Sequence, residues 1–243
     1  MFLLSGCGDR TDQTLSPPND AHWVTVQFKV PEGTTLQPLQ VMYRSDICND
    51  TSQNSNGQSY DIKGINGFKQ NFNQQGKSEI WQTRIAIEGG GSCQWMLNSI
   101  KVSFNLSDTV PLVTGKKNIS TNYIFDFDDF GLSDGYGTGK QKHAEGNIKI
   151  DSDFFPKIFI NKMFHETSIE MFGGDVNNRQ WSRRYKLQGA QNIVIEPKLH
   201  ANKIVTLESN EKAPGLSIRY PDGAVEKSDR IIPDYSKLLL LVK

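Results

Sequence analysis

A serine between two glycines is the strongest candidate nucleophile in this sequence. Gly131, Ser133 and Gly135 match the G-x-S-x-G pattern of serine hydrolases. That chemistry needs the serine on a sharp turn between a strand and a helix, so that helix N–H groups face the oxyanion. The residues that follow, YGTGKQKHAEG, are too rich in glycine to begin a helix. We therefore predict a glycine-rich hairpin turn here and a protein that is not an enzyme.

Acidic and histidine side chains are the next candidates, because they bind metal ions. The segment DFDDFGLSDG places four aspartates close together, but an EF-hand counted from Asp126 would have Phe130 and Gly137 at ligand positions. The segment HETSI resembles a zinc-protease helix but has Ile169 where the second histidine belongs. A calcium site of another kind remains an alternative to a solvated acidic hairpin. We expect neither a metal nor another cofactor.

The overall composition points to a globular protein that does not bind nucleic acid. The chain has 243 residues, of which 36% are hydrophobic and 10% aromatic, enough to form a core. Its 27 basic and 27 acidic residues balance, whereas a nucleic-acid-binding protein needs clustered positive charge. The apolar run LLLLV near the C-terminus is far shorter than the roughly 20 residues that span a bilayer.

Short segments of alternating polarity predict a mainly β protein. Residues 22–30, 39–48, 80–88 and 93–106 alternate or nearly alternate, and eight further segments of this kind follow residue 121. We expect 80–106 to form a hairpin and 49–79, rich in Asn, Gln, Ser and Gly, to form a long connection. The fold class is all-β, with at most short helical turns. We predict two β-sandwich-like halves, at 22–108 and 119–243.

The N-terminal residues resemble a lipoprotein processing site. Leu4, Ser5, Gly6 and Cys7 match the lipobox of bacterial lipoproteins, although only four residues, MFLL, precede the small ones. The resemblance implies a truncated signal over 1–7 and a lipid on Cys7. The residue after Cys7 is Gly8, whereas lipoproteins retained in the inner membrane typically have Asp at this position. The resemblance therefore implies that the protein is located at the periplasmic face of the outer membrane. The polar residues 8–21 are expected to be a flexible tether. The alternative is a chance match at a frayed terminus.

If Cys7 carries a lipid, the remaining two cysteines form a pair. Cys48 and Cys93 lie 45 positions apart, and a disulfide closing such a loop stabilises a protein by roughly 3–4 kcal/mol. An exported protein meets the oxidising compartment that this bond needs. We predict that Cys48 and Cys93 are joined, with two buried free thiols as the alternative.

Charge separates locally along the C-terminal part. An acidic stretch contains Asp126, Asp128 and Asp129, and the basic, aromatic stretch RQWSRRYK contains Arg183, Arg184 and Tyr185. Arginine and aromatic residues are frequent at protein interfaces, so these six residues are candidate contacts for a partner. The alternative is that they are ordinary solvated strand faces and turns.

The function implied by these patterns is binding. VMYRSDIC, SCQWMLNSIKVSF and RYPDGAVEKSDRIIPDY resemble segments of small envelope lipoproteins of enteric bacteria. Some of these are immunity proteins against type VI secreted toxins. We expect a membrane-anchored protein that binds a partner protein, with a toxin as the first candidate. The alternatives are an assembly component of a secretion machine and a carbohydrate-binding or peptidoglycan-binding lipoprotein using Trp81, Trp95 or Trp181.

Overall fold

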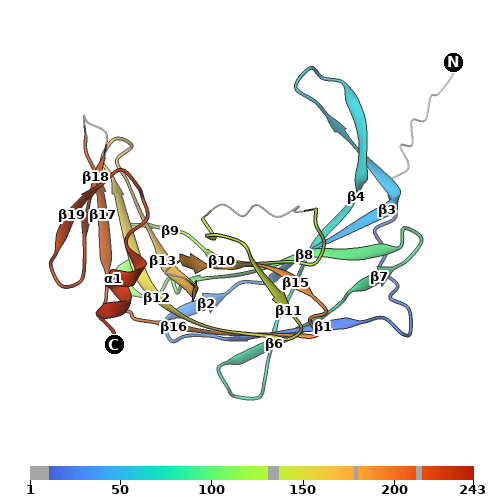
Figure 1. Cartoon of the computed structure of the whole chain (residues 1–243), viewed down its shortest axis with the longest axis horizontal. Coiled ribbons are helices and arrows are strands. Elements are labelled where there is room, and N and C mark those ends of the chain that lie inside the picture. The colour runs from blue at the N-terminus through green and yellow to red at the C-terminus, as the bar shows by residue number, and fades with distance from the viewer. Residues whose placement is uncertain (1–10, 131–136, 178–179, 212–214) are drawn as a thin grey trace.

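The chain folds almost entirely into β-strands, which form two sheets (Figure 1). The structure is a computed structural model that describes residues 11–130, 137–177, 180–211 and 215–243. The only helices among these residues are the short 3-10 helix η1 (Pro111–Val113) and the six-residue helix α1 (Tyr235–Leu240). Neither is long and apolar enough to span a bilayer. The predicted all-β fold class is confirmed.

Sheet I is the larger sheet and has eleven strands. Its main order is β19-β18-β17-β12-β16-β1-β6-β5, and β13 pairs with β12, β14 and β9. The strands are β1 (Trp23–Lys29), β5 (Asn73–Gln74), β6 (Ile80–Ala86), β9 (Lys117–Asn118), β12 (Ile148–Asn161), β13 (Glu166–Asn177), β14 (Gln180–Ser182), β16 (Asn192–Leu199), β17 (Val205–Ser209), β18 (Leu216–Arg219) and β19 (Val225–Ser228).

Sheet II has eight strands in the main order β11-β15-β10-β8-β3-β4, and the short strands β2 and β7 both pair with β8. The strands are β2 (Thr34–Leu36), β3 (Leu39–Gln53), β4 (Ser59–Gln70), β7 (Glu88–Gly90), β8 (Trp95–Leu106), β10 (Thr121–Asp126), β11 (Lys142–Glu145) and β15 (Arg184–Gln188).

The two sheets pack face to face over the main apolar core. Alternate residues of β1, such as Val26 and Phe28, are fully buried, as the period-2 pattern predicts. Phe28 of sheet I contacts Phe104 of sheet II, with the ring centroids 5.1 Å apart and the edge of one ring facing the other. Phe104 in turn contacts Phe154 of sheet I at 5.3 Å. Interdigitated aromatic rings of this kind contribute packing energy beyond the area they bury.

The division into halves at 22–108 and 119–243 does not follow the sheets, because both ranges contribute strands to each. Val26 of β1 lies opposite Ile193 of β16 in a parallel pair, and Tyr123 of β10 lies opposite Val102 of β8. Residues 22–108 and 119–243 therefore share both sheets. Alternation reveals where strands are, but it does not identify their neighbours, and most of these pairs are distant in sequence.

A second, smaller core lies at one end of sheet I. It is built around Phe155, Phe172, Leu207 and Ile218, and α1 covers it with Leu238. The long strand β12 links the cores, since it pairs with β16 up to Phe154 and with β17 from Lys157. Pro156 lies at this change of partner, where its missing N–H removes no ladder hydrogen bond on that side. In Figure 1 this end, with β17 to β19, lies at the left.

Much of the range 49–79, expected to be a connection, is a long hairpin. Beyond a bulge between Ser45 and Asn49, β3 and β4 continue to pair through Gln53 and Ser59. This projecting part, residues 49–63, is called the arm and extends away from the sandwich in Figure 1. No strand of sheet I among the described residues covers it, and most of its residues are exposed and polar. It therefore lacks the apolar alternation that marks a half-buried strand.

The expected hairpin over 80–106 is also corrected. β6 pairs with β1 in sheet I, whereas β8 pairs with β3 and β10 in sheet II. The chain changes sheets at Ile87, whose N–H bonds the carbonyl of His22 and whose carbonyl accepts from Leu97. Both segments form strands, as their alternation predicts. They belong to different sheets and face each other across the core, whereas the strands of a hairpin would be paired within one sheet.

The described part of the expected tether is held against the sandwich. Residues 11–18 are called the docked segment. The Ser16 N–H bonds the carbonyl of Gly89 over 2.8 Å, and Asn66 Nδ2 donates to the carbonyl of Gln13 over 2.8 Å. Leu15 packs against the main core. The expectation of a flexible tether therefore fails for residues 11–18. These contacts are isolated hydrogen bonds and one apolar contact with residues distant in sequence, and they leave no periodic pattern in the sequence.

Candidate functional site

The acidic residues of the predicted contact surface have partners within the protein. Asp126 ends β10, is only 2% exposed and accepts hydrogen bonds from Arg184 Nε and Gln141 Nε2, each over 2.7 Å. Asp128 accepts from Asn98 Nδ2 over 2.6 Å. Asp129, which is exposed, lies 3.0 Å from Lys186 Nζ. This stretch neutralises its charge against neighbouring strands of sheet II.

The basic residues are equally involved in the fold. Arg183 is 6% exposed, and its guanidinium donates to the carbonyls of Asn122 over 3.1 Å and Gly173 over 2.9 Å. It also lies 4.9 Å from the centre of the Trp181 ring. Burial lowers the pKa of Arg183, although nearby groups such as Tyr123 oppose this. Tyr185 is 2% exposed, and burial raises the pKa of its hydroxyl.

The predicted contact surface is therefore corrected. β10 and β15 pair in parallel, which brings the acidic and basic stretches together, as expected for complementary charges. Asp126, Arg183 and Tyr185 are too buried to contact a partner without a rearrangement of the fold. Asp128 and Arg184 are half-buried and engaged in internal bonds, which leaves Asp129 as the exposed member of the set.

The predicted disulfide is confirmed. Cys48 and Cys93 are bonded, with their Cα atoms 5.4 Å apart. The bond fastens the base of the arm to the turn before β8. Ser45 Oγ donates to the carbonyl of Cys93 over 2.6 Å and accepts from the backbone N–H of Cys48 over 2.8 Å, so the base of the arm is fixed on two sides.

The metal, nucleophile, lipidation and tryptophan candidates complete the set of predicted site residues. No group of three or more His, Cys, Asp or Glu side chains there could hold a metal ion. Ser133 and Cys7 fall in 131–136 and 1–10, outside the described residues. Of the tryptophans considered as sugar platforms, Trp95 is fully buried and donates through Nε1 to the carbonyl of Asp12 over 3.1 Å.

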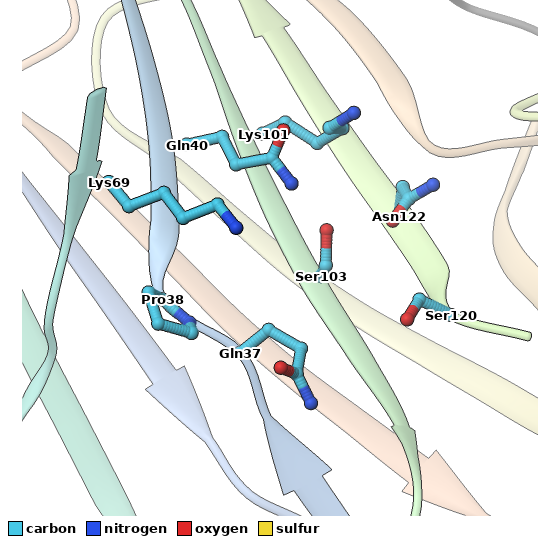
Figure 2. Close-up of a pocket in the computed structure, with 8 residues that line it drawn as sticks. All are labelled: Gln37, Pro38, Gln40, Lys69, Lys101, Ser103, Ser120 and Asn122. Carbon is cyan, nitrogen blue, oxygen red and sulfur yellow. The ribbon is translucent and has the colours of Figure 1, made fainter. Parts of the chain in front are cut away.

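A polar pocket of about 310 Å³ lies on the outward face of sheet II (Figure 2). Four neighbouring strands of sheet II contribute to it. Gln40 of β3 lies opposite both Lys69 of β4 and Lys101 of β8, and Asn122 belongs to β10. In Figure 2 the Lys69 side chain extends across β3 toward Ser103. Its lining residues are Gln37, Pro38, Gln40, Lys69, Lys101, Ser103, Ser120 and Asn122. They offer ammonium, amide and hydroxyl groups and include no carboxylate.

The two lysines give this pocket its electrostatic character. Neither Lys69 nor Lys101 forms an ion pair with another described residue, although many lysines of the chain do. Gln37 is held in place, since its Nε2 donates to Asn105 Oδ1 over 2.8 Å. The pocket is therefore suited to an anionic, hydrogen-bonding ligand. The pocket could not be predicted from the sequence, because these residues resemble an ordinary solvated strand face until the strand register is known.

Comparison with known proteins gives no relative. No protein-family model, no curated protein and no solved structure matches the chain.

Proposed function

We propose that this chain is a lipid-anchored, non-enzymatic lipoprotein at the periplasmic face of the bacterial outer membrane, and that its folded body binds a partner protein. A secreted antibacterial toxin, against which it would act as an immunity protein, is the partner class that the sequence resemblance implies. The observation that carries the proposal is the docked segment, residues 11–18, next to the candidate lipidation site Cys7.

The docked segment gives the anchor a defined relation to the body. Cys7 is four residues from Thr11, a length of chain that reaches at most about 14 Å. The Thr11 hydroxyl bonds the carbonyl of Asn49 at the base of the arm. A lipid on Cys7 would therefore hold the arm side of the body close to the membrane. The opposite end, with β17 to β19 and α1, would point into the periplasm (Figure 1).

The disulfide supports export. Bonds of this kind persist in the bacterial periplasm and are rare in the reducing cytosol. Cys93 is almost fully buried, and the Cys48–Cys93 bond braces a projecting hairpin that has no second sheet behind it. A structural bond at this position is consistent with a protein that folds outside the cytosol.

The character of the polar pocket supports binding over catalysis. Its lining residues include no His, Asp, Glu or Cys, the side chains that most often serve as acids, bases or nucleophiles. Ser103 and Ser120 could act as nucleophiles only with a base, and neither Lys69 nor Lys101 hydrogen-bonds them. Without that pairing, the pocket presents groups that hold a ligand but do not activate one.

Cell fractionation tests the anchoring part of the proposal. The full chain is expressed behind a lipoprotein signal peptide in a bacterium fed an alkyne fatty acid. We expect the wild type to be labelled and to sediment with the outer membrane, and Cys7→Ser to be unlabelled in the soluble periplasm. A Cys7→Ser protein that still sediments with the membrane would contradict the proposed anchoring.

Co-purification tests the binding part of the proposal. The Cys7→Ser chain is purified together with the products of neighbouring genes, and failure to retain any of them would count against partner binding.

A further inference from the structure

The polar pocket continues into a second hollow of different chemistry. This hollow of about 490 Å³ shares Gln37 and Pro38 with the polar pocket, so the two are contiguous. It lies between β2 and the neighbouring edge of sheet I, near β5 and β6. Its apolar wall is formed mainly by Val30, Leu36, Phe72 and Trp81.

We propose that the two hollows form one groove that binds an acidic polypeptide segment carrying an apolar side chain. The inference rests on the proposed function as a binding protein and names the surface and the chemistry of its partner. The groove, defined by the lining residues of both hollows, replaces the stretches around Asp126 and Arg183 as the contact surface.

The positive charge of the groove favours a partner with negative charge. Lys69 and Lys101 stand on neighbouring positions across Gln40, and no described carboxylate pairs with either ammonium. The two lysines lie on the strands that flank β3, two strand spacings or roughly 10 Å apart, so a ligand of opposite charge placed between them would be attracted by both. An Asp or Glu side chain of a partner would supply that charge, and amide and hydroxyl groups of Gln40, Ser103 and Asn122 could bond its backbone.

The apolar hollow favours a partner segment that also carries an apolar side chain. Phe72 is buried and Trp81 is half-buried, and both pack with the main core, so the wall of the hollow is rigid. Aromatic residues set in such hollows are the usual anchors of protein interfaces. A small anion would fill the polar pocket alone. An extended peptide, whose residues advance about 3.3 Å each, can reach both hollows across Pro38.

The groove also lies away from the candidate anchor. Gln40 in the groove and Asn49 at the docked segment are nine positions apart on β3, which corresponds to roughly 30 Å of strand. A body anchored near the arm would therefore leave the groove open to soluble proteins of the periplasm.

Peptide selection tests this inference. The full chain carrying Cys7→Ser is immobilised and exposed to random peptides displayed on phage. We expect enrichment of sequences with Asp or Glu beside an aromatic or aliphatic residue.

The double variant Lys69→Glu/Lys101→Glu should weaken binding of an enriched peptide by roughly tenfold or more, because two attractive charges become repulsive. The same peptide should change Trp fluorescence of the wild type, and Trp81→Phe should remove this change while peptide binding persists.

The control is Lys203→Glu/Lys227→Glu, which makes the same charge change at one half-buried and one exposed lysine outside the groove. It should leave the affinity within about twofold. Enrichment of basic or neutral peptides, equal losses in both double variants, or no involvement of Trp81 would overturn the inference. If Lys69→Glu/Lys101→Glu still retains a gene-neighbour product as the wild type does, the groove is wrong but the proposed function stands. If the wild type retains no such product, the proposed function itself fails.

Discussion

Arg184 Nε donates to Asp126 Oδ2 over 2.7 Å, joining the basic stretch of the chain to the acidic one. The parallel pairing of β10 with β15 brings them together, with Phe125 opposite Tyr185. Two stretches that are charged in the sequence thus neutralise each other within sheet II. Their charged residues pair with each other inside the sheet, so we expect mutations in these stretches to change the stability of the fold.

Asp126→Ala should therefore lower stability and leave partner binding unchanged. The substitution leaves Arg184 without its carboxylate and empties a buried site, at a cost of roughly 1–3 kcal/mol in the free energy of unfolding. Urea unfolding of Asp126→Ala, Arg184→Ala and the double variant measures the coupling. We expect the double variant to lose less than the sum of the two single variants. Purely additive losses would show that the pair is not energetically coupled.

Removing the disulfide should loosen the arm and destabilise the whole chain. Cys48→Ala/Cys93→Ala should cost roughly 2–5 kcal/mol in the free energy of unfolding, because the loop between the cysteines is no longer closed in the unfolded state. Chemical denaturation without reductant measures this loss. Reduced wild type should match the double variant. An unchanged midpoint in both would contradict a structural role of the bond.

The docked segment should detach in acid. The Ser92 hydroxyl, with a smaller contribution from Thr14, lowers the pKa of Asp12 to about 2. Because this pKa lies below the unfolded value near 4, the carboxylate's contribution is complete above about pH 4 and is lost as the pH falls through about 2. The indole N–H signal of Trp95, which bonds the Asp12 carbonyl, reports docking by NMR. In Ser92→Ala the transition should move to higher pH, and an unmoved transition would contradict this role of Ser92.

Gly90→Ala should release the docked segment at neutral pH. A Cβ at Gly90 would lie 2.2 Å from the Ser16 carbonyl oxygen, and the residue has φ of 62°. Gly76→Ala is a matched control, because Gly76 has φ of 61° but nothing within 4 Å of its Cβ position. Both variants bear a backbone strain of roughly 1–2 kcal/mol. Limited proteolysis should cleave residues 11–18 rapidly in Gly90→Ala alone, and equal cleavage in both variants would contradict the docking contact.

The sequence patterns predict where the strands of the sandwich lie, but they do not predict which strands pair with each other. Alternation found β1 almost residue by residue, because Val24, Val26 and Phe28 face a continuous core. It could not show that β1 pairs with β16, which lies about 170 positions away. The arm was missed for the opposite reason, since a hairpin without a covering layer has no apolar face to alternate.

The candidate site was predictable only in part. The Cys48–Cys93 bond followed from counting cysteines, and the structure confirms it. The groove could not be found in this way. Lys69 and Lys101 are separated by 32 positions, and only the register of β4, β3 and β8 places them on either side of Gln40. The charge of the Asp126 and Arg183 stretches was visible in the sequence, but their burial was not.

Photo-cross-linking in living cells tests most directly whether the chain binds a partner protein through this groove. A photoreactive residue is placed at Lys69, or at Lys227 as a control, in the full chain expressed behind a lipoprotein signal peptide in the organism that encodes it, grown as a dense culture. We predict that illumination joins the Lys69 position to one protein in the outer-membrane fraction, and that the Lys227 position gives no such product. The same adduct from Lys227, or no protein adduct from Lys69, would contradict a groove that captures a protein.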